Sequence, residues 1–158
     1  MTPFFKIYLS STTYHWWDLK NYRWKQKLTN LVKKYNRNIR FIDLLKNKSE
    51  NPEVCPLDIK DINRSDFVVI YLNKLSIGTL LELGYCIFTH KKYCVITTSP
   101  YVIKHPWIRY LCKDNVYLNI NKVARLICKK YDKFMKKNYY SNKKKKFYGN
   151  KKANKNTK

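Results

Sequence analysis

One carboxylate stands between leucines in residues 76–85, a stretch that also holds two of the only three glycines in the chain. The run before it, residues 67–72 (FVVIYL), is typical of a buried strand. Gly78 therefore lies where a strand turns into a helix, and Glu82 is expected in the first turn of that helix. At a helix start, the backbone N–H groups and the acid would point toward the same position, and the helix dipole favours the ionised form of the acid.

Glu82 has a structural and a chemical interpretation. An acid at a helix start can simply complement the helix dipole, which is the common case. The two glycines favour chemistry instead, because Gly78 lets the backbone come close to a ligand and Gly84 costs a helix about 1 kcal/mol relative to alanine. We expect Gly84 to let its helix pack tightly on the sheet.

The surrounding chain alternates between predicted strands and helices. Strands are expected at residues 4–10, 38–45, 66–72, 93–98 and 116–120, and helices at residues 16–35, 57–64, 79–89, from 105 onward and at 122–136. Alternation of this kind predicts an α/β fold of the flavodoxin/Rossmann-like type, a doubly wound parallel sheet of about five strands with helices on both faces.

Ligands of a doubly wound sheet bind beyond the carboxyl ends of its strands, which separates candidate site residues from the other polar residues. Ser10 and Ser11 follow the core of the first predicted strand, and Asn73 and Ser76 follow the third. All four side chains are therefore expected at the edge of the sheet where a ligand would bind.

Asp58 opens a predicted helix that runs back down the sheet, which places it at the same edge. It can cap that helix after Pro56 or act in catalysis, and the sequence leaves both roles open. Asp66, by contrast, begins the third strand, and a strand of this length at about 3.3 Å per residue places it roughly 20 Å from that edge. We expect Asp66 to be structural.

Four pieces of sequence occur in a recognisable order: Asp58, the run 65–69 (SDFVV), the run 76–78 (SIG) and the run 82–85 (ELGY). In this order, and on compatible elements, they resemble the nucleoside 2-deoxyribosyltransferase family and the related 2'-deoxynucleoside 5'-phosphate N-hydrolases. The resemblance covers most of residues 5–112, and the opening strand at residues 6–11 (KIYLSS) supports it.

The resemblance implies an enzyme that cleaves or transfers the N-glycosidic bond of (deoxy)nucleosides or nucleoside 5'-monophosphates. Glu82 would be the nucleophile that attacks the anomeric carbon, leaving a glycosyl-enzyme ester for water or a second base to resolve. Asp58 would handle the proton that the leaving base must acquire. Neither a cofactor nor a metal is implied. Family members are commonly homo-oligomers whose neighbouring subunit closes the active site.

Substrate contacts are expected from the edge of the sheet and from the start of the helix that carries Glu82. The residues concerned are Tyr8, Ser10, Ser11, Asn73, Ser76, Gly78 and Thr79. Ser76 stands where the transferases usually carry an acid and the N-hydrolases a serine, which favours a 5'-phosphate held by this hydroxyl and by helix N–H groups. Ser10 and Ser11 replace the glycine of the first loop in both branches, and the arginine of the N-hydrolases is not evident there. Tyr8 can stack on a base or pack in the core.

The charge of the chain is high and unevenly placed. Hydrophobic residues make up 44% and aromatic residues 16% of the chain, which is too apolar for a protein disordered throughout. The net charge is +24, and residues 129–158 hold thirteen lysines and one acid. We expect one α/β domain at residues 1–137 and a basic, disordered Lys/Asn-rich tail at residues 138–158. The tail either improves solubility or binds nucleic acids weakly.

The remaining composition excludes several classes of protein. The five cysteines form no C-x-x-C pair and the three histidines show no metal-ligand spacing, so neither a disulfide framework nor a metal site is indicated. No signal-peptide pattern is present, and no apolar run approaches the ~20 residues that span a bilayer. These features predict a soluble, cytoplasmic protein. The alternative to the enzyme is a non-catalytic nucleotide- or nucleic-acid-binding domain with a polybasic tail.

Overall fold

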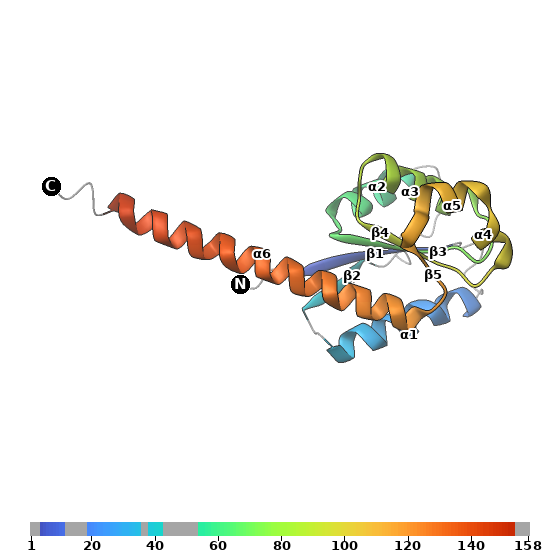
Figure 1. Ribbon diagram of the computed structural model, residues 1–158, viewed down its shortest axis with the longest axis horizontal. Helices are drawn as coiled ribbons and strands as arrows, with labels where there is room; N and C mark the ends of the chain where they lie inside the picture. The colour runs from blue at the N-terminus through green and yellow to red at the C-terminus, as the bar shows by residue number, and fades with distance from the viewer. Residues whose placement is uncertain (1–3, 12–18, 36–37, 43–53, 154–158) are drawn as a thin grey trace.

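Five strands and their connecting helices form the part of the chain that the computed structural model describes, residues 4–11, 19–35, 38–42 and 54–153 (Figure 1). Side chains are described in these ranges except at residues 19–22 and 141–153. The strands are β1 (Phe5–Ser11), β2 (Ile39–Ile42), β3 (Phe67–Tyr71), β4 (Tyr93–Ile96) and β5 (Val116–Tyr117). The helices are α1 (Leu19–Tyr35), α2 (Val54–Arg64), α3 (Ile77–Phe88), α4 (Pro100–Lys104), α5 (Pro106–Cys112) and α6 (Ile120–Ala153), with a short 3-10 helix, η2 (Lys113–Asn115), before β5.

All neighbouring strands pair in parallel, in the order β2-β1-β3-β4-β5. This is the strand order of flavodoxin-like doubly wound sheets, so the structure confirms the predicted fold class. The direction of winding reverses between β1 and β3, because β2 lies on one side of β1 and all later strands lie on the other. In such sheets a crevice for ligands opens at this point, beyond the carboxyl ends of the two strands.

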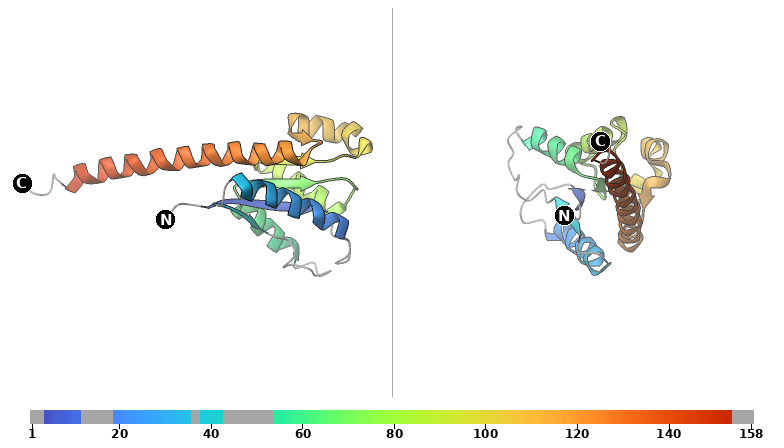
Figure 2. Two further views of the ribbon diagram at one scale, coloured as in Figure 1. Left: turned by 90° about the horizontal axis from the view of Figure 1, so that it is seen from below. Right: turned by 90° about the vertical axis from the view of Figure 1, so that its left-hand side faces the viewer.

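Helices cover both faces of the sheet, which explains why its central strands are apolar on both sides (Figures 1 and 2). α1 and α6 cover one face, where Leu28 and Ile127 lie in one buried cluster with Leu9 of β1. α2, α3, α4 and α5 cover the other face, where Ile62 and Leu83 lie in one buried cluster with Val68 of β3 and its neighbours.

The expected elements are present, and their ends differ in places from the expected ones. α2 begins at Val54, three residues early, and α4 is an additional short helix that the sequence pattern does not predict. α3 begins at Ile77, because Ser76 rather than Gly78 takes the extended conformation of an N-cap residue. Glu82 therefore lies in the second turn of α3, and its expected place in the first turn is wrong.

α6 is a single helix of 34 residues that continues to Ala153, where the sequence predicts disorder after residue 137. Its first half is anchored on the sheet, since Tyr131 and Phe134 pack edge-on against Phe5 of β1. Once a helix is nucleated, each added residue costs little free energy, and lysine is a good helix former. The helix thus runs on past the sheet, at the end where the strands begin (Figures 1 and 2). The division into a domain and a separate tail stays a prediction.

No helix within the described ranges is both long and apolar enough to cross a membrane. Nor do the described His, Cys, Asp and Glu side chains form a group that could hold a metal ion. The five cysteines are all free thiols, of which Cys55 is exposed, Cys128 is half-buried and the other three are buried.

Candidate active site

Glu82 is held near the carboxyl end of β1, beside the point where the winding of the sheet reverses, by two hydroxyl groups of β1. Tyr8 and Ser10 lie two residues apart on this strand, so both side chains point to the face that α3 covers. The Tyr8 hydroxyl donates a hydrogen bond of 2.9 Å to Glu82 Oε1, and the Ser10 hydroxyl donates one to Glu82 Oε2. Each carboxylate oxygen of Glu82 therefore has its own hydroxyl donor.

The surroundings of Glu82 act on its pKa in opposite directions. Glu82 is partly buried, and burial raises the pKa of its carboxyl above the ordinary value. The hydrogen bonds from Ser10 and Tyr8 lower the pKa, because they stabilise the ionised form, and the charge of Lys25 also lowers it. The charge of Asp58 raises it. Burial and the neighbouring Glu82 raise the pKa of the Tyr8 hydroxyl, so Tyr8 stays protonated and remains a hydrogen-bond donor.

Asp58 is a second acid that influences Glu82, and it comes from α2. Its charge raises the pKa of both Glu82 and Tyr8, which places it within electrostatic reach of the two groups. Because α2 begins at Val54, Asp58 lies inside the helix and does not cap it, which removes the capping alternative. Asp61, one turn further along, forms an ion pair with Arg64 at 2.9 Å. The structure thus places a second carboxylate, Asp58, within electrostatic reach of Glu82.

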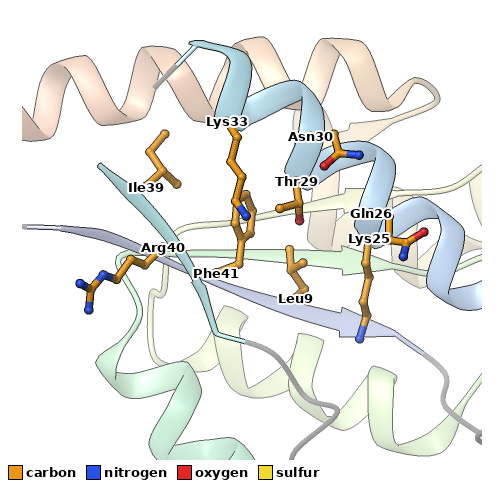
Figure 3. Close-up of a pocket in the computed structure, with 9 residues that line it drawn as sticks. All are labelled: Leu9, Lys25, Gln26, Thr29, Asn30, Lys33, Ile39, Arg40 and Phe41. Carbon is orange, nitrogen blue, oxygen red and sulfur yellow. The ribbon is translucent and has the colours of Figure 1, made fainter. Parts of the chain in front are cut away.

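Lys25 carries a charge that acts on Glu82, and it is not among the residues that the sequence predicts for the site. Its side chain comes from α1 and is only 5% exposed. Figure 3 shows it reaching toward the carboxyl end of β1, along the wall of a cleft of about 410 Å³ that Leu9 also lines. A sequence signal exists, since Lys25 lies three residues before Leu28 and seven before Val32. That spacing puts a charge on the apolar side of the predicted helix.

The start of α3 lies at the carboxyl end of β3, at the same edge of the sheet. Ser76 is the N-cap residue of α3, but its hydroxyl makes no capping hydrogen bond to the helix. A Cβ atom added at Gly78 would meet no described atom within 4 Å, so the first turn borders open space. Thr79 is buried. Of the three substrate contacts expected here, Gly78 is exposed and Ser76 is half-buried, so a ligand can reach both, whereas Thr79 is out of reach.

Two further expected substrate contacts are placed differently, because β1 is a central strand covered on both faces. Tyr8 is fully buried with its hydroxyl on Glu82, so its ring does not stack on a base. Ser11 alternates with Ser10 along β1 and points to the face that α1 and α6 cover, away from Glu82. Its hydroxyl forms no hydrogen bond within the described ranges. Residues 12–18, the rest of the first loop, lie outside them.

Asn73 bridges the ends of β3 and β4, where the sequence predicts a substrate contact. Its side-chain nitrogen donates hydrogen bonds to the Tyr71 hydroxyl (2.7 Å) and to Thr98 Oγ1 (3.1 Å). Its side-chain oxygen accepts hydrogen bonds from the Thr98 backbone N–H (2.7 Å) and the Thr97 hydroxyl (3.2 Å). Both ends of the amide are thus used within the chain, which holds the two strand ends together.

The structure overturns the expected role of Gly84 and confirms that of Asp66. The tight packing expected at Gly84 is wrong, because a Cβ atom there would meet no described atom within 4 Å. Asp66 is structural, as predicted. Its Oδ2 accepts a hydrogen bond of 2.8 Å from the Lys6 N–H, and its own N–H donates one of 2.7 Å to the Lys6 carbonyl.

Comparisons with known proteins define the class of fold. No protein-family model matches the sequence, and no curated protein matches it. Among solved structures, the chain is similar to a 2-deoxyribosyltransferase from the psychrotolerant bacterium Bacillus psychrosaccharolyticus, with a TM-score of 0.54 and 20% identity over 75% of this chain and 90% of that one. It is also similar to a conserved protein from Enterococcus faecalis V583, with a TM-score of 0.51 and 17% identity over 78% of this chain and 87% of that one. At these identities the likeness shows the α/β fold alone.

Proposed function

We propose that the protein cleaves or transfers the N-glycosidic bond of (deoxy)nucleosides or their 5'-monophosphates, with Glu82 as the nucleophile. The observation that carries this proposal is the pair of hydroxyl donors, Tyr8 and Ser10, one on each oxygen of Glu82. These bonds orient the carboxylate at the crevice where doubly wound sheets bind ligands. The fold likeness to a 2-deoxyribosyltransferase supports the same activity.

The first step breaks the bond between the sugar and the base. A Glu82 oxygen attacks the anomeric carbon, the carbon–nitrogen bond breaks, and its electron pair leaves with the base. Asp58 acts in its protonated form and gives the base a proton. The hydrogen bonds from Tyr8 and Ser10 stabilise the ionised form of Glu82, which suits its role as the nucleophile.

The second step resolves the glycosyl-enzyme ester. Water or a second base attacks the anomeric carbon, and the ionised Asp58 takes up the proton that the attacking group loses. Glu82 leaves as a carboxylate, and the hydroxyls of Tyr8 and Ser10 stabilise its returning charge. Attack by water completes a hydrolysis, whereas attack by a base completes a transfer.

A 5'-phosphate fits the start of α3. Ser76 has a hydroxyl that the helix does not use for capping, and Gly78 leaves open space beside the N–H groups of the first turn. Anions bind well at such helix starts, because the N–H groups have no partner within the helix and the dipole favours negative charge. These features favour nucleoside monophosphates as substrates, which suits the cytoplasmic location that the sequence predicts.

The proposal includes a homo-oligomer, because α3 exposes large apolar side chains. Ile77 is 75% exposed, Leu81 is 69% exposed and Phe88 is 83% exposed, and their spacing places them along one side of the helix. Gly84 lies between them and leaves room for close approach. A second copy on this side of α3 would cover the helix that carries Glu82 and stand beside the crevice.

The test is chromatographic detection of free base. The protein is incubated with the common deoxynucleosides and their 5'-monophosphates, with and without a second acceptor base. Glu82→Gln is the test variant, and Asp132→Asn, which removes an exposed carboxylate on α6, is the matched control. We expect base release that Glu82→Gln abolishes and Asp132→Asn leaves unchanged.

The outcomes separate the two chemistries. Release from monophosphates without an acceptor identifies a hydrolase, and exchange that requires the acceptor identifies a transferase. If no substrate releases base in a manner that depends on Glu82, the proposed activity is refuted on this panel, and a non-catalytic nucleotide-binding domain becomes the better account.

A further inference from the structure

α6 carries a regular stripe of basic side chains on its outer face. Lys122, Arg125, Lys129, Lys133 and Lys136 are all exposed. They follow one another at intervals of three or four residues, which places them within about 80° of the helix circumference at 3.6 residues per turn. These five residues form what we call the basic stripe.

The opposite side of α6 fixes the direction in which the basic stripe points. Val123, Ala124, Ile127 and Tyr131 are buried in the cluster that joins α6 to α1 and the sheet. A helix packed along its apolar side cannot turn about its axis, so the basic stripe faces solvent. Among the described side chains of α6 there is one acid, Asp132, at the border of the stripe.

The same helix carries further charge away from the domain. α6 runs past the end of the sheet where the strands begin, which is opposite to the end at which Ser10 binds Glu82 (Figures 1 and 2). Between residues 141 and 153 the sequence of this helix adds six lysines and no acid. The projecting part of α6 is therefore basic in composition and lies far from the crevice.

We propose that the basic stripe binds the sugar-phosphate backbone of a nucleic acid duplex, without regard to base sequence. From Lys122 to Lys136 the stripe covers about 21 Å at 1.5 Å per residue. One strand of a duplex carries a phosphate about every 3.4 Å along its axis, so this length spans about six phosphates. Five cations thus meet about six phosphates of one strand, and the release of counterions from the duplex drives such binding.

The basic stripe suits a nucleic acid better than a membrane or a second copy of the chain. A helix that lies on a lipid surface inserts its apolar side, whereas the apolar side of α6 is packed on the sheet. A second copy of the stripe would bring like charges together.

The test is fluorescence anisotropy of a labelled 20-base-pair duplex over a series of NaCl concentrations. The stripe variant replaces three lysines at once, Lys129→Gln, Lys133→Gln and Lys136→Gln. The control variant makes the same change in net charge at three exposed lysines elsewhere, at residues 60, 92 and 104. Circular dichroism checks that both variants keep their helical content.

The salt dependence gives the expected result. Each phosphate contact contributes about −0.9 to the slope of log K against log salt, so the stripe variant should have a slope shallower by about 2 to 3. The control variant should keep the slope of the unmodified protein. Equal changes in both variants, absence of duplex binding, or tighter binding to vesicles of phosphatidylserine and phosphatidylcholine would each overturn the proposal. Glycosidase activity should be the same in all three proteins.

Discussion

The hydroxyl of Tyr8 should decide at which pH Glu82 becomes ionised, and Tyr8→Phe isolates its effect. Tyr8 is fully buried, and phenylalanine keeps the ring in place while removing the donor to Glu82 Oε1 at 2.9 Å. Ser10 still serves Oε2 in this variant. The change therefore removes one hydrogen bond from the carboxylate without emptying the core.

The magnitude follows from the type of hydrogen bond. A hydrogen bond to a charged group contributes about 1.5 to 3 kcal/mol, and about 1.4 kcal/mol corresponds to a factor of ten. Tyr8→Phe should thus raise the pKa of Glu82 beyond its already raised value. At pH values below the pKa of Glu82, Tyr8→Phe should lower kcat/KM by about 10- to 100-fold. At higher pH, where the carboxylate is ionised in both proteins, the loss should be smaller.

The dependence of kcat/KM on pH checks this prediction, and an NMR titration checks it without a substrate. The chain has three glutamates, Glu50, Glu53 and Glu82, so ¹³C-glutamate NMR gives a simple spectrum in which Glu82→Gln identifies one signal. The midpoint of that signal should move to higher pH in Tyr8→Phe. Tyr93→Phe is the control, because its hydroxyl donates to the Leu111 carbonyl at 3.2 Å instead. A midpoint that stays in place, or moves to lower pH, would refute the reasoning.

Four other perturbations have expected outcomes. Burial raises the pKa of Glu82, so the chain takes up a proton on folding at pH values between the ordinary and the raised pKa. The free energy of unfolding therefore falls as pH rises through that range. Glu82→Gln should lose this part of the pH dependence, measured by urea unfolding from pH 4 to 8. Lys25→Met should move the NMR midpoint of Glu82 to higher pH, whereas Lys25→Arg should leave it nearly unchanged, since the positive charge lowers the pKa of Glu82. Asn73→Ala should lower the free energy of unfolding by about 2 kcal/mol, because it removes four hydrogen bonds that are partly open to water; an unchanged urea midpoint would contradict the bridging role. Leu81→Lys should convert an oligomer to monomers in size-exclusion chromatography with light scattering, and an unchanged mass would argue against association through α3.

The sheet and the place of Glu82 could be predicted because both depend on local signals. The apolar run of β3 and the polar residues that follow it mark a strand end within a few positions of the sequence. Parallel pairing then follows from the alternation of strands and helices. The spacing from that strand end to Glu82 is sufficient to place the acid near the ligand-binding edge, even though the sequence predicts the start of α3 two residues late.

The groups around Glu82 could not be predicted in the same way, because they come from distant parts of the chain. Tyr8 lies 74 residues before Glu82, and only the pairing of β1 with β3 brings the two together. The alternation of side chains along β1 points Ser10 and Ser11 to opposite faces of the sheet, although their neighbouring positions predict the same role for both. Asn73 is used within the chain because β4 ends beside it, a proximity that depends on the packing of two strands.

The thiols of the chain offer a chemical probe of the crevice. Cys55 is exposed near the start of α2, about one turn before Asp58. Burial raises the pKa of Cys86 to about 12 and raises the pKa of Cys94 and Cys112 as well, so these buried thiols stay protonated and unreactive at neutral pH. A maleimide dye should therefore attach first at Cys55, with no cysteine added or removed. The fluorescence of that dye would then report, from one helical turn away, when a ligand reaches the crevice.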